Sequence, residues 1–195
     1  KMQKQLADLE RNGMETTAGE NIAEAEMQNI GIPKSDNMEC PHEFDCTFDL
    51  ERGLALAKQV NKPLLVDFTG WSCVNCRKME EYVWSDPQVW DMINENYVLV
   101  SLYVDDKTNL PEEHQISRYT NNEVSTVGKL WSDLQIHKYQ NNSQPYYVLL
   151  DHQQNVLVKP PKGYTPSVSE YLSYLETGIE EFERRQSRQQ ASLLK

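Results

Sequence analysis

Two cysteines separated by two residues are the side chains of this chain best suited to do chemistry. Cys73 and Cys76 follow a short apolar run and open a stretch with helical character. Unpaired backbone N–H groups and the positive end of the helix dipole at such a position favour a thiolate, the nucleophilic form of cysteine. Cys76 falls one turn further on, close enough to attack a mixed disulfide formed at Cys73. The pair is therefore expected to alternate between a dithiol and a disulfide.

The same CxxC spacing also occurs in zinc sites and in structural disulfides. A four-ligand zinc site needs a second CxxC pair or a Cys/His pair at ligand spacing, and the sequence has neither. His42 is far from the pair along the chain, and five residues separate Cys40 from Cys46. Redox chemistry is therefore favoured, with no metal and no diffusible cofactor. The alternatives from other classes are a metal-delivery module with two soft sulfur ligands and a binding module with an inert disulfide.

The elements next to the pair determine how the sulfurs are presented. The apolar run from Leu64 to Phe68 predicts a short buried strand, which Thr69 and Gly70 break. The stretch from Arg77 to Val83 then predicts a helix. Strand, turn, dithiol and helix follow one another directly, so Cys73 is expected where the buried strand gives way to the helix.

The rest of the chain supplies the layers of an α/β fold. Helices are predicted from a cap at Thr47 or Asp49 to about Val60, from Asp86 and Pro87 onward, over the stripe Val127, Leu130, Trp131 and Leu134, and from Thr165 and Pro166 to Phe182. Strands are predicted from Tyr97 to Val104 and as a hairpin of Tyr146 to Leu150 with Val156 to Val158. Short crossovers favour a parallel pairing of the first two strands, and the hairpin adds an antiparallel half. Residues 105 to 123 are expected to form a surface loop, and Arg184 to Lys195 a solvated tail.

The N-terminal part is polar and differs in character from the rest. Residues 1 to about 30 carry only a sparse apolar stripe, formed by Met2, Leu6 and Leu9. This stripe predicts a frayed helix or a linker. A docking arm for another domain is the functional alternative. Further on, Cys40 and Cys46 either close a small disulfide-bonded loop or remain two separate thiols.

Composition excludes some partners and leaves the compartment open. The formal net charge of the 195-residue chain is -11, which disfavours nucleic acid as a partner. The longest apolar stretch, Tyr97 to Val104, is far shorter than the roughly 18 residues of a membrane span. The chain begins at Lys1 without a signal-peptide pattern, so we expect a processed form or an excised piece of a larger protein. Four cysteines suit an oxidising compartment and the cytosol equally.

These motifs together resemble a thioredoxin-fold protein. They are Val66-Asp67-Phe68 ahead of the pair, Trp71 beside it, Cys73-Val74-Asn75-Cys76 opening a helix, and Gln144-Pro145 before the hairpin. More narrowly, the chain is similar to the C-terminal periplasmic domain of DsbD-type thiol:disulfide interchange proteins, through Lys62-Pro63-Leu64-Leu65-Val66-Asp67, the Cys-Val-X-Cys pair, Met79-Glu80 and Ser85-Asp86-Pro87-Gln88-Val89. The resemblance implies an N-terminal extension over 1–46, a thioredoxin-like domain over 47–185 with a mixed sheet flanked by helices, and a tail over 186–195.

The resemblance also implies roles for individual residues. Asp67 matches the buried acid that exchanges a proton as the deeper cysteine reacts, and Glu80 matches a second acid thought to moderate Cys73. Pro145 matches the proline whose preceding peptide bond is cis and faces the active site. Gly163 either allows close backbone approach there or is an ordinary turn glycine. Trp71 is implied as a neighbour of the pair, although Ser72 stands where most thioredoxins have Trp.

The function implied is that of a protein-disulfide reductase. Cys73 would attack a partner's disulfide, and Cys76 would release the reduced partner. The partners implied are protein thiols and disulfides, with a membrane-embedded domain as electron donor. The location implied is periplasmic or otherwise extracytoplasmic, with membership of a membrane-anchored protein as one alternative, in the context of cytochrome c biogenesis. A CxxC pair can run in either direction, so a disulfide oxidase or isomerase is the alternative among enzymes.

Overall fold

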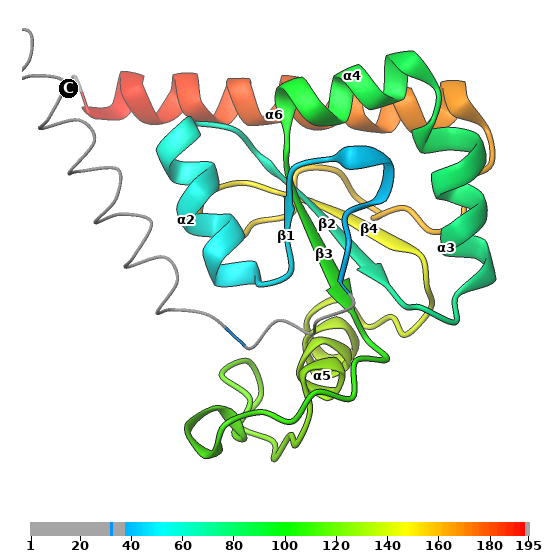
Figure 1. The fold of residues 1–195 in the computed structure, drawn as a ribbon. Helices are drawn as coiled ribbons and strands as arrows, with labels where there is room; N and C mark the ends of the chain where they lie inside the picture. Colours follow the sequence, from blue (N-terminus) through cyan, green and yellow to red (C-terminus); the bar gives the residue numbers. More distant parts are fainter. Residues whose placement is uncertain (1–31, 33–37, 194–195) are drawn as a thin grey trace, which may run out of the picture. The chain divides into compact units, whose positions relative to one another are not determined.

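The computed structural model describes residues 32 and 38–193. The frayed helix or linker predicted over residues 1–30 lies outside the described residues. Helices flank both faces of a four-stranded sheet (Figure 1). The elements in chain order are η1 (Pro41–Glu43), β1 (Cys46–Thr47), α2 (Leu50–Val60), β2 (Leu64–Thr69), α3 (Val74–Met79), η2 (Glu80–Trp84), α4 (Pro87–Asn96), β3 (Val98–Tyr103), η3 (Glu112–His114), α5 (Val127–Tyr139), β4 (Tyr146–Leu150) and α6 (Val168–Leu193).

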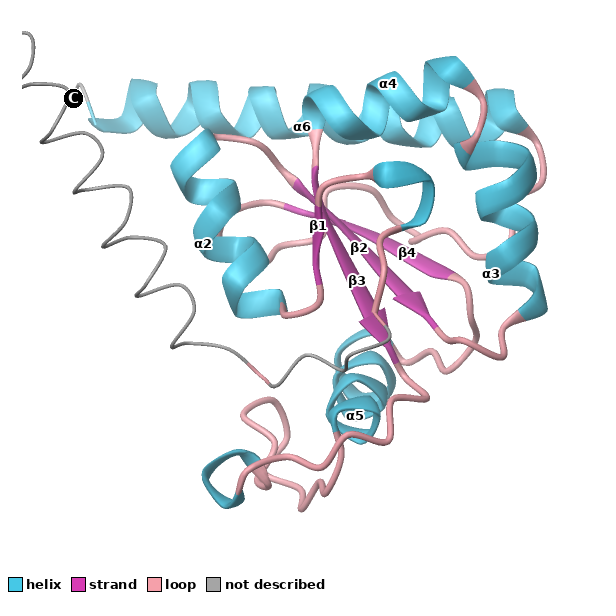
Figure 2. Cartoon of the chain, in the orientation of Figure 1, coloured by secondary structure: helices cyan, strands magenta, loops and turns pink. Residues whose placement is uncertain are grey.

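The sheet is mixed and has the order β1-β3-β2-β4 (Figure 2). β2 pairs in parallel with β3 and antiparallel with β4, and β1 adds a short parallel edge to β3. All residues of β2, β3 and β4 are buried. A strand covered on both faces has no need of polar residues at every second position, which explains their continuous apolar runs. The predicted α/β fold with a mixed sheet is confirmed.

Alternate residues of β2 face two separate cores. Leu64, Val66 and Phe68 pack in the core shared with α2 and α5, whereas Leu65 packs in the core shared with η2, α4 and α6. Asp67 has the same parity as Leu65. The carboxyl of Asp67 therefore faces the layer that contains the helix of the dithiol.

The helix starts follow their capping residues. The side chain of Asp49 accepts hydrogen bonds from the first turn of α2, and Asp86 does the same for α4, where Pro87 is the first residue. Such caps satisfy backbone N–H groups that have no partner within the helix. These starts and the fully buried Trp131 of α5 are as the sequence predicts.

The predicted second strand of the hairpin is wrong. Val156 makes a single bridge to Leu150, and Val156 to Val158 do not form a strand. Pro160 and Pro161 follow after Lys159, and proline has no N–H with which to extend a ladder. The segment instead returns to the sheet at Lys162, which bridges to Tyr147.

The last helix is longer than its apolar stripe indicates. α6 continues to Leu193, so the solvated tail predicted from Arg184 is helical over most of its length. Arg185 explains the continuation, because it pairs with Asp151 at 2.8 Å and with Glu181 at 2.7 Å. These two ion pairs hold α6 against the turn after β4.

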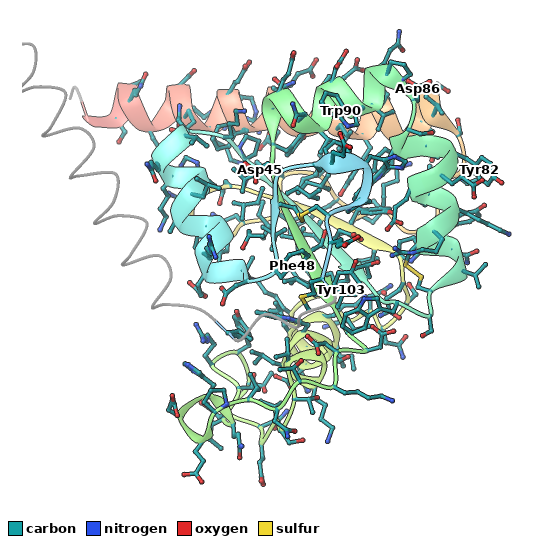
Figure 3. All side chains as sticks on the ribbon, in the orientation of Figure 1. Asp45, Phe48, Tyr82, Asp86, Trp90 and Tyr103 are labelled. Carbon is teal, nitrogen blue, oxygen red and sulfur yellow. A yellow bond between two sulfur atoms is a disulfide. The ribbon has the colours of Figure 1, made fainter. Side chains whose placement is uncertain are left out.

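A second disulfide closes a loop against the helix that follows the dithiol. Cys40 and Cys46 are bonded to each other, and the loop between them carries η1. Phe44 of this loop stacks on Trp90 with ring centroids 5.6 Å apart, and Trp90 Nε1 donates to the carbonyl of His42 at 3.1 Å. Trp90 of α4 lies beside this loop (Figure 3). The bridge thus fastens the start of the domain to the layer under the active-site helix.

Replacing both Cys40 and Cys46 with Ala is expected to lower the free energy of unfolding by about 2 kcal/mol, because the bridge restricts the unfolded chain. Urea unfolding of the oxidised proteins, followed by tryptophan fluorescence, measures the loss. Replacing Cys73 and Cys76 with Ala is the matched control. Their bridge spans only three positions, so it restricts a shorter loop of the unfolded chain than the Cys40–Cys46 bridge does. An unfolding free energy equal to that of the wild type would contradict the structural role of the bridge.

Candidate active site

The cysteines of the CxxC pair are bonded to each other at the start of α3. Their sulfur atoms are 2.04 Å apart. Cys73 is the N-cap residue, and its Sγ accepts a hydrogen bond from the backbone N–H of Cys76 at 3.1 Å. Cys73 is half-buried, whereas Cys76 is only 1% exposed. A partner therefore reaches the sulfur of Cys73 first.

The helix of the dithiol changes its hydrogen-bonding pattern after six residues. α3 ends at Met79 and continues as the π-helical turn η2, where the sequence predicts a regular helix. π-helical turns are rare and recur at functional sites. Met79, Val83 and Trp84 are buried in this segment, while Tyr82 is 62% exposed and points away from the sheet (Figure 3).

Asp67 is a buried carboxyl on the strand that leads to the dithiol. Its side chain is 3% exposed, and within residues 32 and 38–193 its Oδ1 has no hydrogen-bond partner. Burial raises the pKa of Asp67 well above the ordinary value of 3.8, the charge of Glu80 raises it further, and Arg77 opposes both. A carboxyl with this environment holds a proton far more tightly than an exposed aspartate does.

Glu80, at the end of the dithiol helix, forms an ion pair with Arg77 of the same helix. Arg77 Nη2 lies 2.8 Å from Glu80 Oε1 and donates to Thr69 Oγ1 at 3.2 Å. Burial raises the pKa of Glu80, and the charges of Arg77 and His42 oppose the increase. The ring of His42 also contacts the backbone carbonyl of Glu80 at 2.5 Å. The disulfide-bonded loop thus reaches directly into this charge cluster.

Trp71 and Tyr103 form an aromatic pair next to Cys73. Their ring centroids are 4.7 Å apart, and the indole of Trp71 is 40% exposed. Val74, on the other side of Cys73, is 66% exposed. The dithiol is therefore flanked by apolar surface that a bound partner can cover.

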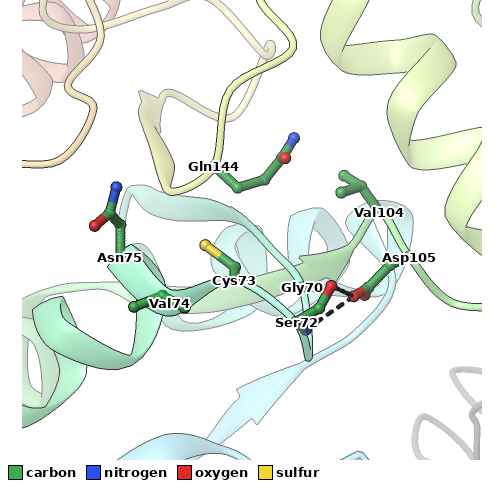
Figure 4. A pocket seen from close by; sticks show the side chains of 8 residues that line it. All are labelled: Gly70, Ser72, Cys73, Val74, Asn75, Val104, Asp105 and Gln144. Carbon is green, nitrogen blue, oxygen red and sulfur yellow. Dashed lines mark hydrogen bonds between the residues drawn. The ribbon is translucent and has the colours of Figure 1, made fainter.

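A pocket of about 340 Å³ opens directly at Cys73 (Figure 4). It is lined by Gly70, Ser72, Cys73, Val74, Asn75, Val104, Asp105 and Gln144. Gln144 comes from the segment before β4, and its peptide bond to Pro145 is cis. The predicted cis bond is therefore present, and the residue before it faces the dithiol across the pocket.

Gly163 does not need to be glycine for packing. A Cβ atom added there would lie 3.8 Å from the carbonyl oxygen of Pro145, which is an ordinary contact. Of the two interpretations given for Gly163, the turn glycine agrees better with this spacing.

The structure adds three residues that the sequence analysis missed. Arg77 and His42 interact with Glu80, one of the predicted acids. Asp105 binds Ser72 and lines the same pocket as Cys73. Asp105 had one usable signal, because it directly follows a strand predicted to be parallel to the one that ends at the dithiol. The carboxyl ends of parallel neighbours meet at one edge of a sheet. Nothing in the spacing of His42 indicates that it contacts Glu80.

In the part of the chain that the structure describes, no three His, Cys, Asp or Glu side chains gather into a group suited to hold a metal ion. No helix among the same residues combines the length and the apolar character needed to cross a bilayer.

Known proteins resemble this chain in sequence. The protein-family model described as thioredoxin-like matches residues 45–152. The thiol:disulfide interchange protein DsbD of Vibrio vulnificus (strain CMCP6) is 46% identical over 41 residues, which is 21% of this chain and 7% of that protein. The match therefore spans only a small part of the relative's length, and the same protein of strain YJ016 matches to the same extent.

Two solved structures are similar to most of this chain. A structure described as DsbH oxidoreductase has a TM-score of 0.50 at 18% identity and covers 76% of this chain and 94% of that chain. The reduced C-terminal domain of Neisseria meningitidis DsbD has a TM-score of 0.44 at 14% identity, with coverage of 66% and 93%. The resemblance to DsbD-type proteins that the motifs suggest is confirmed by the curated match. Since the family match extends over more than half of its residues, this chain belongs to the thioredoxin-like family.

Proposed function

We propose that this protein is a thiol:disulfide oxidoreductase that passes electrons from its CxxC dithiol to disulfides of partner proteins. One observation carries the proposal: Cys73 and Cys76 are bonded at the start of α3, with Cys73 open to a pocket and Cys76 buried behind it. The names of the relatives, thiol:disulfide interchange protein and oxidoreductase, support this activity.

The reaction consists of two thiol–disulfide exchanges. In the reduced protein, the thiolate of Cys73 attacks one sulfur of the partner's disulfide, which forms a mixed disulfide and expels the other sulfur as a thiolate. The thiolate of Cys76 then attacks Cys73 Sγ, re-forms the Cys73–Cys76 bond and expels the second partner sulfur. Two electrons pass to the partner, whose two thiolates take up two protons. The oxidised product is the state seen in the structure.

Asp67 is proposed to receive the proton that Cys76 loses. The carboxyl is buried on the dithiol side of β2, and its pKa is raised by burial and by Glu80. A carboxyl with a raised pKa takes up a proton more readily than an exposed aspartate does. Glu80 is proposed to adjust the same equilibrium, and Pro145 and Trp71 to shape the surface that the partner meets.

The carboxyls near the dithiol support reduction as the direction. A negative charge near sulfur disfavours the thiolate. A dithiol whose reduced form is stabilised makes its disulfide a strong oxidant, so the opposite arrangement favours a reductant. Asp67 and Glu80 both lie in the layer of the dithiol helix, although Arg77 offsets part of their charge. Oxidase or isomerase activity is the alternative.

An extracytoplasmic location is proposed from the second disulfide. Cys40 and Cys46 are bonded and lie apart from the dithiol pocket. Bonds of this kind persist in oxidising compartments such as the periplasm and are rare in the cytosol. A membrane-embedded dithiol domain is proposed as the electron donor, as the likeness to DsbD-type proteins suggests, and cytochrome c biogenesis as one use of the electrons.

Trapping tests the proposal. Cys76→Ala is expected to hold partner proteins as long-lived mixed disulfides at Cys73, because the second exchange is then impossible. Insulin serves as the defined probe, and an extracytoplasmic protein fraction as the source of natural partners. Non-reducing gels followed by mass spectrometry identify the captured proteins.

The matched control is the double variant Cys73→Ala/Cys76→Ala, which has no attacking sulfur and is expected to capture nothing. Equal behaviour of the single and double variants would refute the oxidoreductase proposal. Equilibration with glutathione decides the direction separately, since a strongly oxidising potential excludes the role as reductant.

A further inference from the structure

A carboxylate from another strand holds the turn that presents Cys73. Asp105 lies just beyond the end of β3 and accepts three hydrogen bonds, each of 3.1 Å. Figure 4 shows those that come from Ser72. Its Oδ1 accepts from the backbone N–H of Trp71, and its Oδ2 accepts from both the backbone N–H and the hydroxyl of Ser72. The two residues directly before Cys73 are thus attached to Asp105.

The turn and the carboxylate fit closely. The backbone N–H of Cys73 donates to the carbonyl of Gly70 at 3.2 Å, which closes the turn. A Cβ atom added at Gly70 would lie 3.0 Å from the carboxylate carbon and both oxygens of Asp105. Gly70 is therefore the residue that lets Asp105 approach the backbone.

Backbone hydrogen bonds fix the two residues on either side of Asp105. The backbone N–H of Val104 donates to the carbonyl of Thr69 at 2.9 Å, and that of Gly128 donates to the carbonyl of Asp106 at 2.9 Å. The residues on both sides of Asp105 are thereby fixed to the end of β2 and to the start of α5. The backbone that carries the Asp105 carboxylate is therefore fixed in place.

We propose that Asp105 is a positioning residue for Cys73: it fixes the turn that carries the reacting sulfur and places a negative charge at the pocket where that sulfur reacts. The proposal rests on the function proposed above. Exchange requires the attacking sulfur to line up with the partner's S–S bond, so a loosened turn should slow it. Misplacement of a reacting group by about 1 Å can cost up to about 100-fold in rate.

The charge of Asp105 adds to those of its neighbours. The other charged and titratable groups on the neighbouring elements interact with one another: Asp67 of β2, Arg77 of α3, Glu80 of η2 and His42 of η1. Asp105 differs from Asp67 and Glu80, because it lines the same pocket as Cys73. Removing the charge of Asp105 should therefore lower the pH at which the thiol of Cys73 ionises, compared with the wild type.

Four variants separate the hydrogen bonds from the charge. Asp105→Ala removes both, Asp105→Asn removes the charge and keeps one acceptor oxygen, and Ser72→Ala removes one hydrogen bond and keeps the charge. Glu112→Gln neutralises an exposed carboxylate in the same loop and is the control. Each reduced protein is assayed for insulin reduction and for the pH dependence of Cys73 alkylation by iodoacetamide.

Both Asp105 variants are expected to reduce insulin about tenfold more slowly at a pH where Cys73 is fully ionised. The midpoint of their alkylation curve is expected to move down by about half a pH unit. Ser72→Ala should slow insulin reduction less and leave the midpoint in place, and Glu112→Gln should change neither. A change in unfolding alone would not move the midpoint.

An unchanged midpoint in Asp105→Asn, or an insulin rate in Asp105→Ala equal to that of the wild type, would overturn the proposal. If the wild type fails to reduce insulin, the proposed function fails first. The alkylation curves then still decide whether Asp105 acts on Cys73.

Discussion

Replacing Asp67 with Asn is expected to slow the release of a partner from the mixed disulfide by about 100-fold at neutral pH, the usual contribution of one acid–base group. The amide keeps the shape of the carboxyl but cannot accept the proton of Cys76. Single-turnover measurements of the re-formation of the Cys73–Cys76 bond isolate this step, because the first attack by Cys73 is read separately from the appearance of the mixed disulfide. A release rate equal to that of the wild type would exclude Asp67 as the proton acceptor.

The same substitution is expected to make the folded protein more stable at neutral pH. Burial and the charge of Glu80 raise the pKa of Asp67 in the folded state above its ordinary value of 3.8. The folded state therefore binds the proton more tightly, and stability falls as pH rises from near 3.8 through the raised pKa. Every tenfold increase in proton affinity corresponds to about 1.4 kcal/mol. Asp67→Asn removes this loss, so its unfolding free energy should fall less between pH 3.8 and neutral pH than that of the wild type does.

Asp151 supplies a control of opposite sign. Burial tends to raise the pKa of Asp151, but hydrogen bonds from Asn155 and Arg185 lower it overall. Its contribution to stability is therefore present above the ordinary pKa and is lost as pH falls through the lowered pKa. In urea unfolding at a series of pH values, Asp151→Asn should be less stable than the wild type at pH 7, whereas Asp67→Asn should be more stable. Equal signs for the two variants would contradict the assignment.

The predictable parts of the fold are those in which a local sequence pattern, such as an apolar run or a capping residue, matches the burial of that segment in the structure. β2 and β3 are continuous apolar runs, and Asp49 and Asp86 cap α2 and α4 as their sequence positions indicate. The dithiol was recognisable because its spacing and its place after a buried strand are local features. Asp67 and Glu80 could be proposed only through the family resemblance, since a buried carboxyl looks like any other in sequence.

The features that were missed depend on contacts between distant segments. Asp105 meets the turn before Cys73 across 33 and 34 positions, and His42 contacts Glu80 across 38. No periodicity records such pairs. β1 is only two residues long and forms because β3 offers it an edge, and the loop before α5 is held by Asp133, which accepts from Ser117, Thr120 and Asn122. β1 and the loop before α5 each depend on contacts with a distant segment, which the local sequence pattern cannot indicate.

Gly128→Ala is expected to lower the free energy of unfolding by about 3 kcal/mol or more, at the upper end of the effects of overpacking. A Cβ atom at this position would lie 2.6 Å from the backbone N of Asp106 and 2.6 Å from the carbonyl oxygen of Val104. Backbone atoms cannot rotate away as a side chain can, so the segment that carries Asp105 must move. The variant is therefore also expected to reduce insulin more slowly than the wild type.

Gly163→Ala is the matched control, because its Cβ atom has room at 3.8 Å from the nearest atom, the carbonyl oxygen of Pro145. Its unfolding free energy should equal or slightly exceed that of the wild type, since alanine restricts the unfolded chain more than glycine does. Urea unfolding and insulin reduction of both variants provide the comparison. If Gly128→Ala unfolds at the same urea concentration as Gly163→Ala, the close contact between α5 and the segment after β3 is wrong. The support assigned to Asp105 would then be lost with it.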